Sequence, residues 1–286
     1  MPYRESFIET NNINLHVAQA GPDDGKLLIL LHGFPEFWYG WRNQIDFFAQ
    51  LGYRVWVPDQ RGYNLSDKPK GLDAYNVDQL AADVVGLIDA AGVEKAYLVG
   101  HDWGANVAWW TAITHPQRIE RLVILNVPHP VIMRKNLQGN LAQLRKSWYI
   151  FFFQLPWLPV VLGRANNYAM VAQAMLGSCR PGTFTDDDMK LYRAAWAQPN
   201  AYVSMINWYR SILQRQPKRP RSYRVTMPTL VIWGMRDKFL GKETAQQSMN
   251  LVDNGRLEFI ENASHWVQHE EPARVNELIS NFIRDS

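Results

Sequence analysis

Residues 100–104 read Gly-His-Asp-Trp-Gly, and this stretch decides the fold. It follows a short apolar run at residues 96–99 and precedes a helical pattern over residues 105–114. A strand that turns at once into a helix places one side chain on a sharp, strained bend, beside the N-terminus of the helix. The two glycines remove side chains that would collide at so tight a crossing. We therefore predict that Asp102 is presented on this bend.

Strand and helix patterns alternate along most of the chain. Residues 27–31 form a continuous apolar run, as in a buried parallel strand, and the apolar residues of 76–91 recur on one helical face. The remaining strand patterns cover residues 6–9, 13–20, 54–57, 96–99, 121–126, 229–233 and 257–260, and the remaining helix patterns cover 41–50, 105–114 and 272–284. This alternation predicts an α/β fold with a mostly parallel, doubly wound sheet of eight strands flanked by helices.

The alternation breaks at residues 128–130, which read Pro-His-Pro. The segment that follows is helical and aromatic-rich, and its expected helices cover residues 133–154, 165–176, 186–197 and 201–214. A helical block between two halves of one sheet is best interpreted as an inserted cap. We therefore predict a core domain of residues 1–128 and 224–286 and a helical cap domain of residues 129–223. We interpret the basic run from Arg215 to Arg224 as a solvated loop.

The composition limits the function. With 30 Lys and Arg against 27 Asp and Glu, the net charge of +3 gives no reason to expect nucleic acid or an anionic surface as a partner. The single cysteine, Cys179, leaves no internal disulfide and is compatible with a reducing compartment. The first residues are polar, unlike a signal peptide, and the most apolar run, residues 150–162, is too short to span a bilayer. We expect a cytoplasmic protein without stable membrane insertion.

Three reactive side chains, two aspartates and then a histidine, each follow a predicted strand. Asp102 follows residues 96–99, Asp237 follows residues 229–233, and His265 follows residues 257–260. Because reactive groups gather at the carboxyl ends of parallel strands, we expect the three to meet. Nucleophile, acid and then histidine is the chain order of an α/β-hydrolase triad. In that triad the histidine deprotonates water, while the acid holds its tautomer and stabilises the imidazolium.

The stretch His32-Gly33-Phe34-Pro35 ends the strand beside the bend. The N–H of Phe34, together with that of Trp103, is a candidate oxyanion hole. Pro35 is a candidate for a cis peptide bond, which is a device of tight turns. His269 is a rival base, but it falls a full helical turn beyond the strand end, so we rank it below His265.

Four stretches resemble the epoxide hydrolases of the α/β-hydrolase superfamily, and together they extend over nearly the whole chain. Three are core motifs, at residues 32–36, 100–104 and 264–268, the last followed by Glu-Pro at 271–272. The fourth is a pair of cap segments, which resemble those carrying two ring-opening tyrosines, at Tyr149 and Tyr209. Related dehalogenases share the core motifs, so the cap pair is the more specific signal. Asn64 stands where a glycine is more usual, in a loop outside the triad.

The resemblance implies hydrolysis of epoxides to vicinal diols in two steps. Asp102 attacks an epoxide carbon to form an ester, while Tyr149 and Tyr209 hydrogen-bond the ring oxygen and protonate it. Water activated by the His265–Asp237 pair then releases the diol. The expected partners are a small apolar epoxide and water, in a monomer or homodimer with a role such as detoxification, and no metal or cofactor is expected. The expected aromatic substrate contacts are Phe34, Trp103, Phe153, Trp208 and Trp266.

Two other functions stay open. In a haloalkane or haloacid dehalogenase the same aspartate displaces halide, and the indole N–H of Trp103 suits a halide ion. A haloalkane enzyme usually has Asn or Trp at position 34, whereas this chain has Phe34. The third possibility is a non-catalytic ligand-binding homologue, against which the complete triad argues. From spacing alone, Tyr149 and Tyr209 are packing aromatics like their neighbours Tyr168 and Tyr202, and only the resemblance makes them proton donors.

Overall fold

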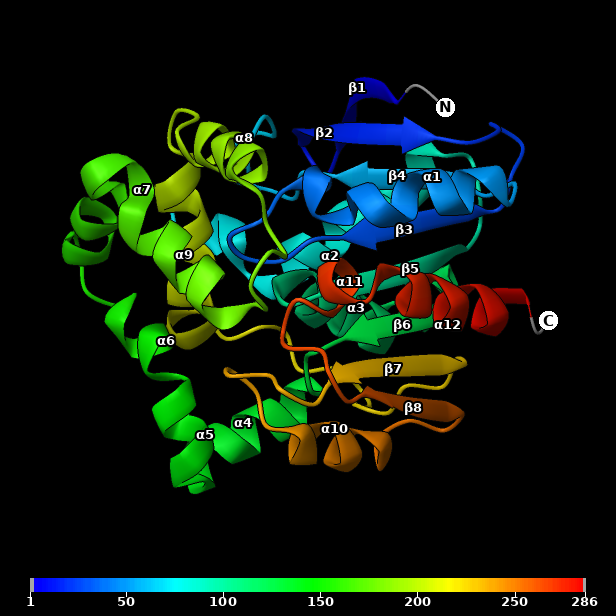
Figure 1. Ribbon diagram of the computed structural model, residues 1–286. Helices are drawn as coiled ribbons and strands as arrows, with labels where there is room; N and C mark the ends of the chain where they lie inside the picture. Colours follow the sequence, from blue (N-terminus) through cyan, green and yellow to red (C-terminus); the bar gives the residue numbers. More distant parts are fainter. Residues whose placement is uncertain (1–2, 285–286) are drawn as a thin grey trace.

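The computed structural model describes residues 3–284 and builds them around one eight-stranded sheet, in the order β1-β2-β4-β3-β5-β6-β7-β8 (Figure 1). The strands are β1 (Arg4–Thr10), β2 (Ile13–Ala20), β3 (Leu27–Leu31), β4 (Arg54–Pro58), β5 (Ala96–His101), β6 (Ile119–Leu125), β7 (Thr229–Gly234) and β8 (Gly255–Ile260). All neighbouring pairs from β4 to β8 are parallel, and β2 is antiparallel to both of its neighbours. The predicted mostly parallel sheet is confirmed.

The central strands are apolar on both sides because helices cover both faces of the sheet. Along β3, Leu28 and Leu30 belong to one core cluster, whereas Leu27, Ile29 and Leu31 belong to the other. The first cluster lies under α1 (Arg42–Gln50) and α12 (Pro272–Arg284), and the second lies under α2 (Val77–Ala90), α3 (Trp103–Thr114) and α10 (Lys242–Met249). This two-sided burial explains why the strand sequences are continuous apolar runs.

The chain between β6 and β7 forms helices that lie beyond one end of the sheet (Figure 1). They are α4 (Pro130–Gly139), α5 (Leu141–Lys146), α6 (Trp148–Phe152), α7 (Leu158–Ser178), α8 (Asp186–Trp196) and α9 (Ala201–Gln214). Within residues 3–284, no helix has the length and apolarity that crossing a membrane requires. These helices, which we call the cap helices, stand over the carboxyl end of β5, where Asp102 lies.

The single helix expected over residues 133–154 is wrong, because the chain breaks there into α4, α5 and α6. Asn140 is extended, with φ −120° and ψ 102°, and its side chain accepts the N–H groups of Ala142 and Gln143. A short polar side chain that caps a helix start competes with helix continuation, and apolar periodicity does not report this competition. A second break occurs at Ser147, whose hydroxyl accepts a hydrogen bond from Gln143.

The helix expected over residues 165–176 is also placed wrongly. It starts at Leu158 and runs to Ser178, but residues 165–168 interrupt it with non-helical backbone angles. Asn166 and Asn167 adopt positive φ, which asparagine tolerates better than most residues. Tyr168 follows them with φ 59°, and its buried hydroxyl donates to the Trp196 carbonyl at 3.0 Å. The kink therefore stores local strain that tertiary packing holds in place.

The crossing of β5 and α3 can be tested by adding one methyl group at Gly100. Its Cβ would overlap the Gly104 carbonyl and the Ala105 nitrogen, which are backbone atoms that cannot rotate away. We expect Gly100→Ala to lower the free energy of unfolding, measured in urea, by about 3 kcal/mol or more, the upper end of the range for overpacking.

Gly177→Ala is the matched control, because a Cβ at this position in α7 meets nothing within 4 Å. Replacing a helical glycine by alanine should raise the free energy of unfolding by up to about 1 kcal/mol. Equal stability of the two variants would contradict the tight crossing at Gly100.

Candidate active site

Asp102 lies at the turn between β5 and α3, with φ 49° and ψ −123°. A positive φ is uncommon for any residue but glycine, and such strain clusters at functional sites. The Asp102 carboxylate accepts the Phe34 N–H through Oδ1 at 2.6 Å. Gly33 permits this approach, since a Cβ there would overlap the Asp102 side chain. The strand, bend and helix therefore form around Asp102 as the sequence predicts.

His265 lies between two carboxylates. Its Nδ1 is 2.8 Å from Asp237 Oδ2, and its Nε2 is 3.5 Å from Asp102 Oδ2. Burial by itself lowers the pKa of His265, but the charges of Asp237 and Asp102 and their hydrogen bonds outweigh burial and raise that pKa to about 10. Burial raises the pKa of Asp237, but the charge and hydrogen bond of His265 outweigh it, so the pKa is lowered overall. While both carboxylates are charged, His265 is therefore protonated at neutral pH.

Asn126 positions Asp237, a role that was not predicted from the sequence. Its Nδ2 donates to Asp237 Oδ2 at 2.8 Å, and its Oδ1 accepts the Gly234 N–H at 3.1 Å. The backbone N–H groups of Phe239 and Leu240 donate to the other carboxylate oxygen, at 2.7 and 2.9 Å. The expected strand ran to residue 126, but β6 ends one residue earlier, and Asn126 has φ 53°. An asparagine directly after an apolar strand was the available signal, because this residue tolerates positive φ.

The two candidate oxyanion donors flank Asp102. The Phe34 N–H already bonds its carboxylate, and the Phe34–Pro35 peptide is cis, as predicted. Trp103 is the first residue of α3, so its N–H has no acceptor within the helix. The structure thus brings one donor onto the Asp102 carboxylate and places the other next to it in the chain.

Two of the cap helices each contribute a tyrosine ring above Asp102. Tyr149 is on α6 and Tyr209 is on α9, and their ring centroids are 5.8 Å apart. Burial raises the pKa of both phenols, and the negative charge of Asp102 raises it further. Both hydroxyls therefore stay protonated at neutral pH and can donate to an oxygen between them and the carboxylate.

Aromatic side chains form the wall around the two phenols. The ring of Phe34 is 5.6 Å from Phe153 and 5.2 Å from Tyr209, and that of Trp103 is 5.0 Å from Tyr209. Trp208 and Trp266, the two other expected contact residues, use their indole N–H groups for hydrogen bonds within the protein. The indole N–H of Trp208 donates to the Arg61 carbonyl, and that of Trp266 donates to the Ser178 hydroxyl.

The rival residues lie in other surroundings. Nε2 of His269 is 2.7 Å from Glu36 Oε1, and its Nδ1 is 3.0 Å from an Arg42 nitrogen. Both ring nitrogens are therefore engaged away from Asp102. Tyr168 and Tyr202 pack against each other, with ring centroids 5.6 Å apart, in the contacts between α7, α8 and α9.

Glu36 is a fully buried carboxylate that connects the cap helices to the loops of the core. The Tyr192 hydroxyl on α8 donates to its Oε1 at 2.8 Å, and His269 bonds the same oxygen. The other oxygen faces Nδ1 of His101 at 3.3 Å, and Nε2 of His101 donates to the His265 carbonyl at 2.8 Å. Burial raises the pKa of Glu36, but the charges and hydrogen bonds of the two histidines outweigh it and hold the pKa well below its usual range. Glu36 thus links α8 to the backbone of the catalytic histidine candidate.

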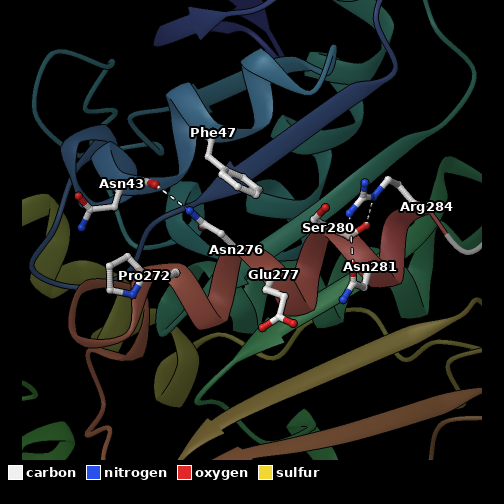
Figure 2. Close-up of a pocket in the computed structure, with 9 residues that line it drawn as sticks. Asn43, Phe47, Pro272, Asn276, Glu277, Ser280, Asn281 and Arg284 are labelled. Carbon is white, nitrogen blue, oxygen red and sulfur yellow. Dashed lines mark hydrogen bonds between the residues drawn. The ribbon is translucent and has the colours of Figure 1, made fainter.

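A surface groove of about 570 Å³ lies between α1 and α12, on the sheet face away from α3 (Figure 2). Asn43 and Phe47 line it from α1, and Asn276 and Ser280 line it from α12. Asn276 donates to the Asn43 carbonyl across its floor at 3.0 Å. No triad or cap residue lines this groove, so it is separate from the Asp102 site.

Over residues 3–284, no group of three or more His, Cys, Asp or Glu could hold a metal ion.

The chain is similar to known proteins over nearly its whole length. The model of the α/β hydrolase fold family matches residues 26–272. AB hydrolase superfamily protein YfhM from Bacillus subtilis is 48% identical over 279 residues, covering 98% of this chain and 97% of that protein. Epoxide hydrolase 1 from Caenorhabditis elegans is 40% identical, covering 97% and 69%. The crystal structure of Bacillus megaterium epoxide hydrolase with an inhibitor matches with a TM-score of 0.89 at 32% identity, covering 98% and 100%.

The charge coupling around His265 predicts a pKa change that NMR can measure. In Asp102→Asn the neutral amide removes one of the charges that stabilise the imidazolium, so the pKa of His265 should fall from its value of about 10. Nitrogen-15 chemical shifts of the imidazole, followed against pH in both proteins, give the two midpoints. Asp253→Asn, which neutralises an exposed carboxylate bonded to Arg224, is the control and should leave the midpoint unchanged. An unchanged midpoint in Asp102→Asn would refute the coupling.

Proposed function

The chain belongs to the α/β-hydrolase family and within it to the epoxide hydrolases, and we propose that it converts epoxides to vicinal diols through an ester on Asp102. The observation that carries this proposal is the placement of two protonated phenols, Tyr149 and Tyr209, over a carboxylate that has a His–Asp pair behind it. A small apolar epoxide fits the aromatic wall around these groups.

In the first step Asp102 attacks an epoxide carbon and the carbon–oxygen bond of the ring breaks. Oδ1 of Asp102 accepts the Phe34 N–H at 2.6 Å, whereas Oδ2 faces Nε2 of His265 at the longer distance of 3.5 Å, so we assign the new bond to Oδ2. A carboxylate needs no prior deprotonation, unlike a serine hydroxyl. The other oxygen becomes the ester carbonyl, already directed at the oxyanion donor.

The phenols act on the other half of the same step. The epoxide oxygen becomes an alkoxide as the ring opens, and one of Tyr149 and Tyr209 donates its proton while the other donates a hydrogen bond. Burial makes these donors more effective, because electrostatic interactions are stronger where water is excluded. Halide displacement needs no proton donor, so the paired phenols favour epoxide opening over the dehalogenase alternative.

In the second step water attacks the ester carbonyl and the diol leaves. Esterification removes the charge of Asp102, and with it one of the interactions that keep His265 protonated. The pKa of His265 then falls, so the imidazole can release its proton to the tyrosinate and next take one from water. Asp237, held by Asn126, stabilises the imidazolium that forms again. Formation of the Asp102 ester thus produces the neutral imidazole that then catalyses hydrolysis of the ester.

Removing the base should leave the Asp102 ester unhydrolysed. His265→Gln should let the first step proceed and block the second, so intact-mass spectrometry after addition of an epoxide should show the protein mass raised by one substrate. Asp102→Ala should show neither the adduct nor turnover, because the nucleophile is gone. An unshifted mass of His265→Gln, with substrate demonstrably bound, would refute the ester mechanism.

Removing the phenols should slow ring opening. Tyr149→Phe or Tyr209→Phe alone should lower kcat by roughly tenfold or more, and the double variant should lower it by about 10³-fold or more, within the range for general acid catalysis. Steady-state diol formation measures both effects.

Tyr202→Phe is the matched control, because this buried hydroxyl on α9 has no hydrogen-bond partner among the described residues. Its kcat should equal that of the unmodified protein. Normal diol formation by the double variant would show that the cap phenols do not open the ring.

A further inference from the structure

The outer edge of the cap carries apolar side chains that are exposed to solvent. They lie on α5, on α6, in the connection to α7 and on the first turn of α7, along one margin of the molecule (Figure 1). We call them the cap-edge patch: Leu141 (73% exposed), Trp148 (63%), Phe151 (48%), Leu155 (42%), Trp157 (67%), Val161 (56%) and Leu162 (41%). Exposed apolar side chains clustered in one segment mark an interaction surface, whereas single ones do not.

The backbone under the patch is held in place. Arg210 on α9 donates through Nε to the Phe153 carbonyl at 3.0 Å and through its guanidinium to the carbonyls of Leu155 and Pro156. These bonds satisfy the carbonyls of the turn between α6 and α7. The side chains of Leu155 and Trp157 nevertheless point outward. Their exposure is therefore a feature of an ordered turn.

The charge around the patch has one sign. Residues 129–185 hold six of the chain's 30 Lys and Arg and none of its 27 Asp and Glu, so this segment carries +6 and the rest of the chain carries −3. Arg134, Lys135 and Arg145 are exposed, and they form no hydrogen bond or ion pair with any described residue. The net charge of +3 conceals this separation.

A surface with this composition fits an anionic lipid bilayer. Tryptophan side chains favour the boundary between water and hydrocarbon, and Lys and Arg next to them attract anionic headgroups. A second copy of the chain fits poorly, because a symmetric dimer through the patch would bring two +6 segments together without a compensating acid. We propose that the cap-edge patch docks this protein peripherally on anionic membranes.

The placement of α6 connects this surface to the site. Trp148 and Phe151 of this short helix are exposed, whereas Tyr149 and Ile150 turn inward, Tyr149 to within 5.8 Å of the Tyr209 ring centroid. One turn of helix thus separates the docking surface from a candidate proton donor. An apolar substrate dissolved in the bilayer would be presented at this edge of the protein. That consequence rests on the proposed function, whereas the docking itself does not.

Vesicle sedimentation of the full chain tests the proposal. The protein should pellet with vesicles of phosphatidylcholine and phosphatidylglycerol, should release as salt is raised, and should bind vesicles of phosphatidylcholine alone at least tenfold more weakly. Trp148→Ser/Trp157→Ser and Lys135→Glu/Arg145→Glu should each lower partitioning into the anionic vesicles at least tenfold.

Matched controls carry the same chemical changes on the core. Phe7→Ser/Leu51→Ser removes exposed apolar side chains from β1 and the end of α1, and Lys95→Glu/Arg274→Glu reverses two exposed charges. Both controls should partition like the unmodified protein. Absence of binding to anionic vesicles, or equal losses in controls and patch variants, would overturn the proposal. It would also be overturned if the tryptophan variant converted a dimer to a monomer in sedimentation velocity and left vesicle partitioning unchanged. Diol formation, assayed on a water-soluble epoxide, tests the proposed function separately.

Discussion

The placement of one imidazole between the buried carboxylate of Asp237 and the partly buried carboxylate of Asp102 is the interaction on which the site depends. His265 is held by Asp237 on one side and faces Asp102 on the other, and the two negative charges keep it protonated. Such an arrangement is costly unless each charge is paired and hydrogen-bonded. Asn126 and two backbone N–H groups meet this requirement at Asp237, and the Phe34 N–H meets it at Asp102. The strained bend at Asp102 and the positive φ of Asn126 place these groups at the same end of the sheet.

The cap supplies the complementary chemistry. The phenols of Tyr149 and Tyr209 come from helices that are far apart in the chain, so their meeting depends on how α6 and α9 pack. Burial keeps both protonated, whereas the core keeps Asp237 ionised. One site thus holds a carboxylate and proton donors in opposite protonation states at the same pH, which is the pattern expected of groups that share an acid–base reaction.

Local sequence rules predict the core well and the cap helices less well. Buried parallel strands have a strong apolar signature, and the meeting of Asp102, Asp237 and His265 follows from where those strands end. Asn140 and the Asn166–Asn167 pair break helices through capping and positive φ, which apolar periodicity does not contain. The role of Asn126 could not be predicted in this way, because Asn126 acts by orienting another residue, Asp237. The cap-edge patch could not be predicted from the net charge, because the net charge sums over segments of opposite sign.

The buried Glu36 has a consequence for how this architecture can diversify. Because its carboxylate joins Tyr192 on α8 to His101 and His269 of the core, a chimera that receives a foreign α8 inherits a buried anion that has lost one of its hydrogen-bond donors unless the tyrosine is transplanted with it. The segment from α4 to α6 has a tether of its own, because buried Gln143 on α5 donates to the Phe239 carbonyl at 2.8 Å and accepts the Gly241 N–H at 3.1 Å. A library that varies this segment therefore has to keep Gln143 as well as the phenol of Tyr149 on α6, whereas one that varies α8 has to keep Tyr192.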